Sequence, residues 1–467
     1  MSRITVIDNT PNQKRSLPEF QHDCDNLRKI ANKTIGELQL ESGILIFPPR
    51  LEDTNDQIKD SVIFNLKEDD KSFSLDTGNI MGFIGRKDTE LNICSRFTHK
   101  IDGKPSEKND YFLHYMLEKV CHINLSNLKS TRTPDMIFDL LPFLFPQYLI
   151  EALRQGLYKE YQTRQYNDSN IKGVIDINRH IRFNIPANGK VAYHTREYSF
   201  DNSITELVRH TIEYMRVSNI FKHILTSNED TKAAVETIIN ATPLYNRMER
   251  NKVLAKTSKT IKSPYFYKYR NLQKICRMIL LHEKIKYDSS DNKIYGILFD
   301  GAWLWEEYLA TLLRENGYKH PENKKKNGVI HPFVKNQVGR FYPDFYKPKS
   351  DHNLKEELAD IILDAKYKNF DVHNPPADDI AQMISYIHVM DARLGEFIYP
   401  SKNTNSSETS WVVKPFANET AIISTKPFFI PQSVSNYSEF RKMIHLSEQK
   451  LIEYRKPIHK IKESKTK

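Results

Sequence analysis

The sequence predicts a multi-domain α/β protein with a mixed α+β N-terminal region, a helical middle region and a C-terminal core in which helices flank a mixed sheet. The chain has 467 residues, which is more than one hydrophobic core usually serves. Strand-like and helix-like segments both occur in its first third, and helical periodicity dominates the middle third. From about residue 296 the order becomes helix, extended segments, strand and helix, as in a small α/β core. We therefore expect domains at residues 1–165, 166–290 and 291–467.

The first two regions are predicted from the length and spacing of their apolar runs. Short apolar runs predict N-terminal strands at residues 44–47, 61–66, 80–84 and 91–94. Longer runs predict helices at residues 110–125 and 136–161. The middle region is expected to begin with a strand near residue 171, which has basic flanks. Its helices are predicted at residues 201–226, 230–241 and 265–286.

The C-terminal region is predicted to open with a helix at residues 302–316. Gly317 is a natural end for this helix, because glycine readily adopts the left-handed conformation found after a last turn. Glu306 lies three residues before Leu309, so this acid shares a helix face with core residues.

Extended segments and a second helix follow in this region. The predicted extended segments are residues 328–333, 339–346 and 361–368. The helix begins at the acidic pair Asp378-Asp379 and carries an apolar stripe. Gln382 and Tyr386 are four residues apart, so they lie on a common face of this helix.

The charge of the chain favours a polyanionic partner such as nucleic acid. The formal net charge is +10 and the isoelectric point is near 9.0. An ordinary basic protein is the alternative, and charge alone does not decide between the two. Basic residues gather near the C-terminal core, at Lys324, Lys325, Lys326, Lys335, Arg340, Lys347 and Lys349. A basic tail at residues 455–467 is either a solvated end or a DNA contact.

Composition and targeting signals favour a cytoplasmic protein that does not enter a membrane. The mean hydropathy is −0.60, and no apolar run is long enough to span a bilayer. The first residues lack the apolar core of a secretory signal. The four cysteines are widely separated and form no Cys-x-x-Cys, so they support neither a disulfide framework nor a zinc site.

Three residues of the C-terminal region carry the chemistry that we expect. Asp344 precedes a predicted hairpin, and Asp364 and Lys366 lie two apart on an apolar strand, where they share a face. Two carboxylates provide hard oxygen ligands for Mg²⁺, which activates water and stabilises charge on a phosphate. The lysine stabilises the attacking hydroxide or the developing negative charge. The arrangement predicts hydrolysis of a phosphodiester, and so a nuclease.

The alternative is a surface ion pair on an edge strand. Asp-x-Lys strings also occur at Asp102, Asp230 and Asp291, but in polar, loop-like sequence or beside the start of a helix. A surface pair does not explain why an acid and a base share one face of an apolar strand, where an unpaired charge is costly. We therefore favour the catalytic interpretation.

These elements together resemble the PD-(D/E)XK nuclease superfamily, and more closely the McrC family, the nuclease subunit of McrBC-type restriction systems. The family's Leu-Phe-Glu, Pro-Asp, Asp-Ala-Lys-Tyr-Lys and Gln-x-x-x-Tyr motifs are similar to residues 304–306, 343–344, 364–368 and 382–386. Two further landmarks are residues 173–176 and 198–202. The resemblance covers about residues 170–395, and the N-terminal third only loosely. It departs in having Trp305 for the expected Phe, and a long loop at residues 347–359.

The resemblance implies roles for six residues. It gives the two aspartates the role of metal ligands, with Mg²⁺ as cofactor, and the lysine the catalytic role. Glu306 would help to ligate or orient the metal, and Gln382 and Tyr386 would support the site or touch the DNA backbone. The alternatives are a structural, buried Glu306 and core hydrogen bonds for Gln382 and Tyr386.

The sequence also lacks a motif that an autonomous motor would need. No Gly-x-x-x-x-Gly-Lys-[Ser/Thr] phosphate loop occurs in it, so a second chain would have to supply nucleotide hydrolysis. The resemblance implies a GTP-hydrolysing AAA+ partner of the McrB type, with the N-terminal region as the motor-docking domain.

The function that we expect is a Mg²⁺-dependent endodeoxyribonuclease subunit of an NTP-dependent restriction complex that cuts foreign double-stranded DNA. Two alternatives stay open: a stand-alone repair or phage-defence nuclease of the same superfamily, and a non-catalytic DNA-binding adaptor.

Overall fold

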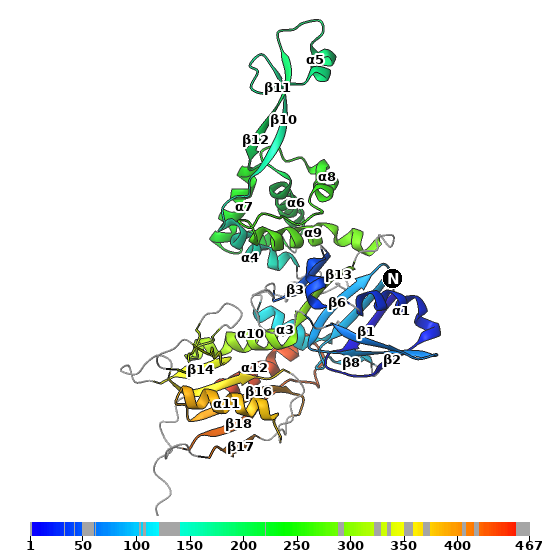
Figure 1. The fold of residues 1–467 in the computed structure, drawn as a ribbon. Helices are drawn as coiled ribbons and strands as arrows, with labels where there is room; N and C mark the ends of the chain where they lie inside the picture. Colours follow the sequence, from blue (N-terminus) through cyan, green and yellow to red (C-terminus); the bar gives the residue numbers. More distant parts are fainter. Residues whose placement is uncertain are drawn as a thin grey trace, which may run out of the picture. The chain divides into compact units, whose positions relative to one another are not determined.

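The structure, a computed structural model, is a mixed α/β fold with several sheets (Figure 1). It describes residues 2–31, 33–41, 43–48, 60, 62–101, 104–105, 109–120, 141–219, 221–287, 294–321, 328–333, 338–349, 358–367, 374–403, 408–414 and 420–453. The contacts divide the chain into two compact units. Unit 1 is Met1–Ser126 with Asp288–Lys467, and unit 2 is Asn127–Tyr287.

Unit 1 contains an N-terminal five-stranded sheet in the order β1-β7-β6-β13-β3. Its strands are β1 (Ser2–Ile7), β3 (Gly43–Phe47), β6 (Ile80–Arg86), β7 (Thr89–Cys94) and β13 (Ile294–Asp300). The two outer pairs, β1 with β7 and β13 with β3, are parallel, and the inner pairs are antiparallel. Apolar side chains of helix α1 (Leu17–Ala31) and helix α2 (Ile35–Leu40) pack with those of the sheet in one core.

β13 joins the N-terminal sheet although it lies late in the sequence. All seven of its residues are buried, and it pairs with β6 on one side and β3 on the other. A strand that is buried on both faces needs such a central position. The domain expected from residue 291 onward therefore starts with a strand of the N-terminal sheet.

Smaller elements complete this part of unit 1. A three-stranded antiparallel sheet has the order β2-β5-β4, and a short hairpin joins β8 to β9. Their bounds are β2 (Gln13–Ser16), β4 (Phe64–Glu68), β5 (Ser72–Thr77), β8 (Lys100–Ile101) and β9 (Lys104–Pro105). Helix α3 (Tyr111–Val120) follows, and buries most of its side chains.

The second large sheet of unit 1 has the order β14-β15-β16-β18-β17. Its strands are β14 (Phe345–Pro348), β15 (Ala359–Ala365), β16 (Leu394–Ser401), β17 (Thr409–Val412) and β18 (Ile422–Phe429). The central pairs are parallel and both edge pairs are antiparallel, so the sheet is mixed. Helix α11 (Ala377–Val389) covers one face, and α10 (Gly301–Leu313) and α12 (Tyr437–Glu453) cover the other (Figure 1).

Helix α10 begins and ends where the local chemistry predicts. The Asp300 carboxylate accepts a hydrogen bond from the backbone N–H of Ala302 at 3.0 Å and so caps the first turn. A short 3₁₀ turn follows the helix, and Gly317 then has the left-handed φ of +79°. The expected stop at Gly317 is confirmed.

Unit 2 is a group of helices with an antiparallel three-stranded sheet, in the order β10-β12-β11. The strands are β10 (Glu160–Asp168), β11 (Val174–Ile175) and β12 (Val191–Ser199). The helices are α4 (Leu141–Leu153), α5 (Ile177–Asn184), α6 (Ser203–Val217), α7 (Glu229–Ala241), α8 (Arg250–Lys256) and α9 (Lys268–Tyr287). The side chain of Asn202 accepts hydrogen bonds from two backbone N–H groups of the first turn of α6 and fixes its start.

Several expectations differ from the structure. The expected helix at 136–161 ends at Leu153, and a strand, β10, starts at Glu160. The expected domain boundary at 165 falls inside β10, whereas the first division of the chain between the two units falls between residues 126 and 127. The expected basic cluster at 324–326, Lys335 and the basic tail at 455–467 lie outside the described residues. None of the described helices combines the length and apolar character needed to cross a membrane.

Candidate active site

The hairpin of β14 and β15 brings Asp344 beside Asp364. Asp344 immediately precedes β14, which pairs antiparallel with β15 so that Phe345 lies opposite Leu363. The Asp344 carboxylate accepts a hydrogen bond from the backbone N–H of Ala365 at 2.7 Å. Two acidic residues that are twenty positions apart in the sequence therefore meet at one end of the hairpin.

Lys366 lies between two carboxylates. Its Nζ is 2.5 Å from Oδ2 of Asp364 and 3.0 Å from Oδ1 of Asp379. The prediction that Asp364 and Lys366 point to the same side of the strand is confirmed by this contact. Burial lowers the pKa of Lys366, but the charge of Asp364 and the hydrogen bonds to both carboxylates outweigh it and raise that pKa. The lysine is therefore a fixed cation at neutral pH.

Asp379 is a member of this cluster that we did not predict. In the sequence it stands only as part of the acidic pair at which a helix begins. In the structure it lies in the first turn of α11, and its side chain is only 12% exposed. The sequence feature that points to Asp379 is its spacing. It precedes Gln382 by three residues and Tyr386 by seven, so it lies on the same face of the helix as these two.

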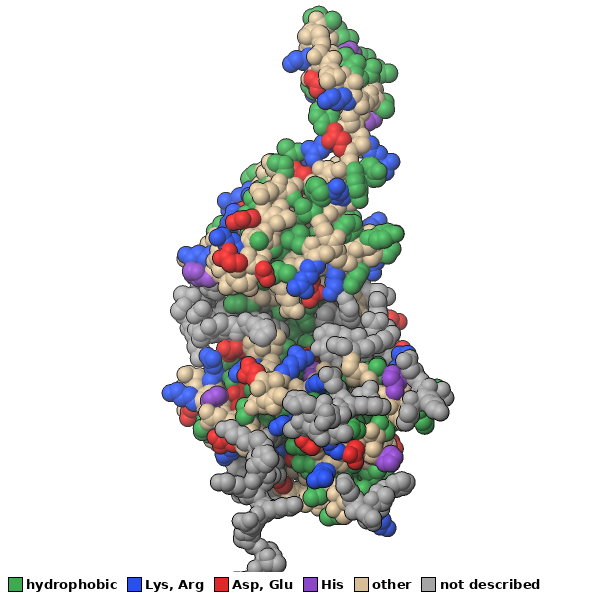
Figure 2. Space-filling view, turned by 90° about the vertical axis from the view of Figure 1, so that its left-hand side faces the viewer, with side chains coloured by type: hydrophobic (Ala, Val, Ile, Leu, Met, Phe, Trp, Pro, Cys, Tyr) green, Lys and Arg blue, Asp and Glu red, His purple; other side chains and the backbone are tan. Residues whose placement is uncertain are grey.

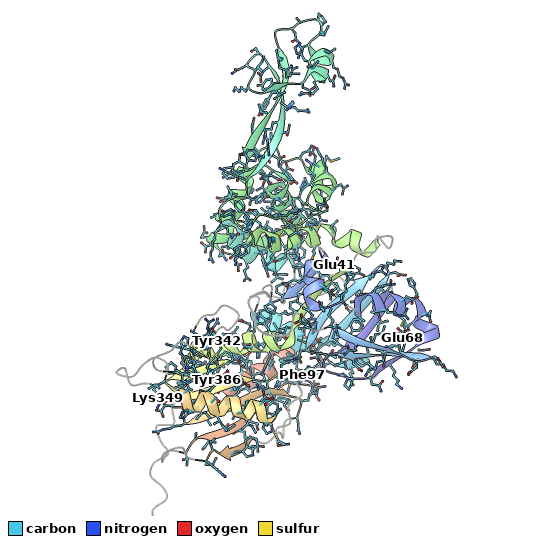
Figure 3. All side chains as sticks on the ribbon, in the orientation of Figure 1. Glu41, Glu68, Phe97, Tyr342, Lys349 and Tyr386 are labelled. Carbon is cyan, nitrogen blue, oxygen red and sulfur yellow. The ribbon has the colours of Figure 1, made fainter. Side chains whose placement is uncertain are left out.

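Gln382 and Tyr386 support the segment that leads into Asp344. Nε2 of Gln382 donates to the hydroxyl of Tyr386 at 3.1 Å, and that hydroxyl donates to the carbonyl of Tyr342 at 3.2 Å (Figure 3). Burial raises the pKa of Tyr386, and the charges of Asp344 and Asp364 raise it further. Tyr386 therefore stays protonated and keeps its hydroxyl available as a donor.

Glu306 reaches the neighbourhood of Asp344 through a histidine. Oε1 of Glu306, on α10, is 3.7 Å from Nε2 of His320, and the His320 side chain is 1% exposed. Nδ1 of His320 is 2.6 Å from the backbone carbonyl of Asp344, and its ring stacks on Phe345 with centroids 4.6 Å apart. Because a carbonyl only accepts, Nδ1 carries the proton in this contact. We did not predict His320, since no pattern in the sequence marks it.

The carboxylates at the hairpin suit a hard divalent cation. With formal charges, Asp344, Asp364 and Asp379 carry three negative charges against the single positive charge of Lys366. Among the described residues, no group of three or more His, Cys, Asp or Glu side chains is arranged to hold a metal ion. Mg²⁺ is usually held by one or two carboxylates, with waters and substrate phosphates as its other ligands. The pair Asp344 and Asp364 fits that pattern, whereas Glu306 faces His320.

Comparison with known proteins gives one family match. The model of the family described as McrBC 5-methylcytosine restriction system component matches residues 75–400. No curated protein matches the sequence.

Two solved structures from Thermococcus gammatolerans are similar at low identity. A refined half-complex from a tetradecameric assembly of McrB AAA+ hexamers with bound McrC is 13% identical, with a TM-score of 0.43, and the match covers 95% of this chain and 100% of that chain. A cryo-EM structure of the McrBC complex is 14% identical, with a TM-score of 0.31, and the match covers 69% of this chain and 90% of that chain.

Proposed function

The chain belongs to the family of McrBC 5-methylcytosine restriction system components, and from that premise we propose that it is the Mg²⁺-dependent endodeoxyribonuclease of such a system. In this proposal the sheet of β14 to β18 is a PD-(D/E)XK nuclease core. Its substrate is foreign double-stranded DNA, and its partner is an AAA+ GTPase.

One observation carries the nuclease proposal. Asp364 lies in β15 of the hairpin, Asp344 immediately precedes β14 and Lys366 immediately follows β15, and the lysine contacts Asp364 at 2.5 Å. An excess of negative charge around one fixed cation attracts a divalent metal and also leaves a group that binds a phosphate oxygen. A structural ion pair needs only one acid for each base, so the additional carboxylates favour a site that works on a charged substrate.

Each residue of the site would have a separate role in phosphodiester hydrolysis. Asp344 and Asp364 would hold Mg²⁺, which when bound supplies Lewis-acid stabilisation of the phosphate and a more acidic water. Lys366 would stabilise the negative charge that develops on the phosphate, because its ammonium is already held in place by Asp364 and Asp379. Tyr386 would keep the Tyr342–Asp344 segment in position through its hydrogen bond to the Tyr342 carbonyl.

The partner proposal rests on the missing phosphate loop and on the family. The sequence contains no Gly-x-x-x-x-Gly-Lys-[Ser/Thr], so GTP hydrolysis would come from another chain. In the assembly from Thermococcus gammatolerans, McrC is bound to McrB AAA+ hexamers. We propose that this chain binds an AAA+ GTPase of that kind and stimulates its hydrolysis.

Unit 2 offers a surface for this partner. Large apolar side chains are exposed around the end that β11 and α5 form, where Figure 2 shows hydrophobic atoms gathered. They include Val174, Ile177, Ile181, Phe183 and Ile185, each of them more than half exposed. Exposed apolar groups of this extent are typical of surfaces that bind another protein. We therefore propose this end of unit 2, rather than the N-terminal region that the resemblance implies, as the surface that docks to the motor.

A reconstituted cleavage assay tests the proposal. The purified chain is mixed with a McrB-type AAA+ GTPase, GTP, Mg²⁺ and a plasmid with or without 5-methylcytosine, and each component is omitted in turn. We expect double-strand cleavage of the methylated plasmid in the complete mixture alone.

Other outcomes favour the two alternatives. Vigorous cutting by the chain with Mg²⁺ alone supports the stand-alone nuclease. Stimulated GTP hydrolysis without any cleavage, together with no Mg²⁺ binding in calorimetry that depends on Asp344 and Asp364, supports the non-catalytic adaptor.

A further inference from the structure

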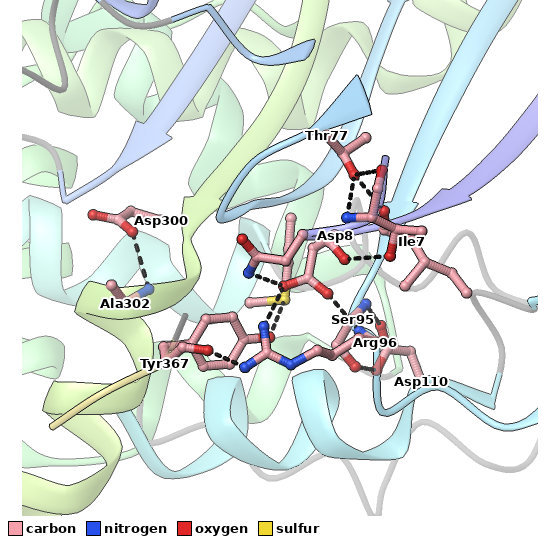
Figure 4. Close-up of polar contacts among 12 residues, drawn as sticks. Ile7, Asp8, Thr77, Ser95, Arg96, Asp110, Asp300, Ala302 and Tyr367 are labelled. Carbon is pink, nitrogen blue, oxygen red and sulfur yellow. Dashed lines mark hydrogen bonds and ion pairs between the residues drawn. The ribbon is translucent and has the colours of Figure 1, made fainter. Parts of the chain in front are cut away.

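The residue that follows Lys366 is held by the N-terminal sheet of unit 1. Tyr367 is 1% exposed, and its hydroxyl contacts the sulfur of Met81, in β6, at 3.3 Å (Figure 4). The same hydroxyl is hydrogen-bonded to the carboxylate of Asp8, at the end of β1. A side chain next to the proposed catalytic lysine is therefore packed into the other sheet of its unit.

Arg96 contacts both the ring and the backbone of Tyr367. Its guanidinium carbon lies 4.5 Å from the centroid of the Tyr367 ring, and Nη2 donates a hydrogen bond to the Tyr367 carbonyl. β15 ends at Ala365, and the backbone N–H of Lys366 makes its last ladder bond, to Ile398, at 2.8 Å. At the next residue, Tyr367, the backbone is held by Arg96 instead of by the neighbouring strand.

Arg96 is itself fixed from two sides. Its backbone N–H donates to Oδ1 of Asp8 at 2.5 Å, and its Nη1 is 3.9 Å from Oδ2 of the same carboxylate. The preceding residue, Ser95, donates from both its N–H and its hydroxyl to the buried Asp110, each at 2.5 Å (Figure 4). The Asp8 side chain is fully buried and that of Arg96 is 14% exposed. Buried charges are retained at a cost in desolvation, so a pair in this place suggests a role beyond packing.

We propose that Arg96, held by Asp8, is a positioning residue that fixes Lys366 against the scissile phosphate from the N-terminal sheet. This proposal rests on the proposed nuclease function. Displacement of a catalytic group by about 1 Å can cost on the order of a hundredfold in rate. Loss of the Arg96 contact frees the Tyr367 carbonyl one residue away from Lys366, and therefore lowers the rate of the chemical step without changing how DNA binds.

The test uses the full chain in complex with its AAA+ partner, GTP, Mg²⁺ and methylated plasmid. For Arg96→Met we expect the single-turnover cleavage rate at saturating DNA to fall about tenfold or more. The dissociation constant for DNA and the stimulated GTP hydrolysis stay at the wild-type values. Arg96→Lys retains a cation that reaches one acceptor, so it restores part of the rate.

Arg15→Met is the matched control. Arg15 also donates a guanidinium hydrogen bond to a backbone carbonyl of the N-terminal sheet, that of Thr5 at 2.7 Å. Its substitution removes the same kind of contact without touching Tyr367, so its cleavage rate is expected to equal that of the wild type.

The outcomes separate this proposal from the proposed function. If the wild-type complex cuts and Arg96→Met cuts at the same rate, the positioning role is overturned and the nuclease function stands. An equal loss in Arg15→Met, or a loss in Arg96→Met that follows weaker DNA binding, also overturns it. If Arg96→Met does not fold, Arg96→Lys decides: a lower rate with unchanged DNA binding supports the role, and a wild-type rate overturns it. A wild-type complex that cuts no DNA overturns both.

Discussion

Asp379 is the residue whose role the structure changes most. Its carboxylate lies 3.0 Å from Nζ of Lys366, so the lysine is held by two anions rather than by Asp364 alone. Hydrogen bonds between charged groups are worth about 1.5–3 kcal/mol, and a loss of about 1.4 kcal/mol in the transition state is a factor of ten in rate.

We predict that Asp379→Asn lowers the single-turnover cleavage rate about tenfold while DNA binding stays unchanged. Asparagine keeps the shape of the side chain but not its charge, so Lys366 is held less firmly. Asp378→Asn is the matched control, because Asp378 is the neighbouring, exposed acid of the same helix turn. Equal rates for the two variants would show that Asp379 is only part of the helix start.

Asp8 makes a pH-dependent contribution to stability. Burial raises its pKa from 3.8 to about 6, against the opposing effect of Arg96. The folded protein thus binds the proton more tightly than the unfolded chain does, so the contribution is full below about pH 4 and is lost as the pH rises through 6. Because a shift of one pKa unit corresponds to 1.36 kcal/mol, the free energy of unfolding falls by roughly 3 kcal/mol over this range.

We predict that Asp8→Asn gains stability relative to the wild type between pH 4 and pH 7.5, since asparagine does not titrate. The measurement is the melting temperature of both proteins across this range by calorimetry. Burial raises the pKa of Asp110 to about 7 and the charge of Asp8 raises it further, so Asp8→Asn also relieves Asp110, which adds to the difference in the same direction. A difference in melting temperature that stays constant with pH would contradict the prediction.

At the scale of elements, the start of α10 and the end of β15 are packed against each other through a glycine. A Cβ at Gly301 would lie 2.7 Å from Cε1 of Tyr367 and 2.8 Å from the carbonyl oxygen of Asn79. Both distances are shorter than non-bonded atoms tolerate. The Asn79 carbonyl is part of the backbone, so it cannot move aside as the end of a flexible side chain could. Only glycine therefore fits between the helix that carries Glu306 and the segment that carries Lys366.

We predict that Gly301→Ala destabilises the protein by about 1–3 kcal/mol, the usual cost of overpacking, and also lowers cleavage because Tyr367 must shift. Gly78→Ala serves as the control, since a Cβ at Gly78 meets nothing within 4 Å. Unfolding in denaturant, followed by a cleavage assay, measures both effects. Equal stabilities for the two variants would contradict this packing argument.

Elements with a strong local pattern could be predicted from the sequence, and elements defined by distant partners could not. The strand of Asp364 and the helix of Gln382 were predicted because their apolar residues have clear spacing. β10 was missed because none of its residues is fully buried and its sequence has no apolar alternation. β13 lies inside the expected C-terminal domain but joins the N-terminal sheet, because its partners, β3 and β6, lie more than 200 residues earlier in the sequence.

The same distinction holds for the site. The proximity of Asp344, Asp364 and Lys366 follows from one hairpin, which the sequence predicts. His320 and Arg96 reach the site from separate segments through tertiary contacts, and no local spacing marks either of them.

At the scale of the whole molecule, the two proposed tasks belong to two different parts of the chain. Unit 1 carries the proposed nuclease site, and unit 2 carries the exposed apolar surface that we assign to the AAA+ partner. A change at the nuclease site should therefore stop DNA cleavage and leave partner binding and GTP hydrolysis intact.

The most direct measurement is cleavage of methylated plasmid by the complex that contains Asp364→Ala, with GTP hydrolysis recorded in the same reaction. We predict that cutting is abolished, because the variant removes a proposed metal ligand and the anion nearest to Lys366. Stimulated GTP hydrolysis is expected to continue at the wild-type rate. Cleavage by Asp364→Ala at the wild-type rate would contradict the central claim that the Asp344, Asp364 and Lys366 cluster is the nuclease site.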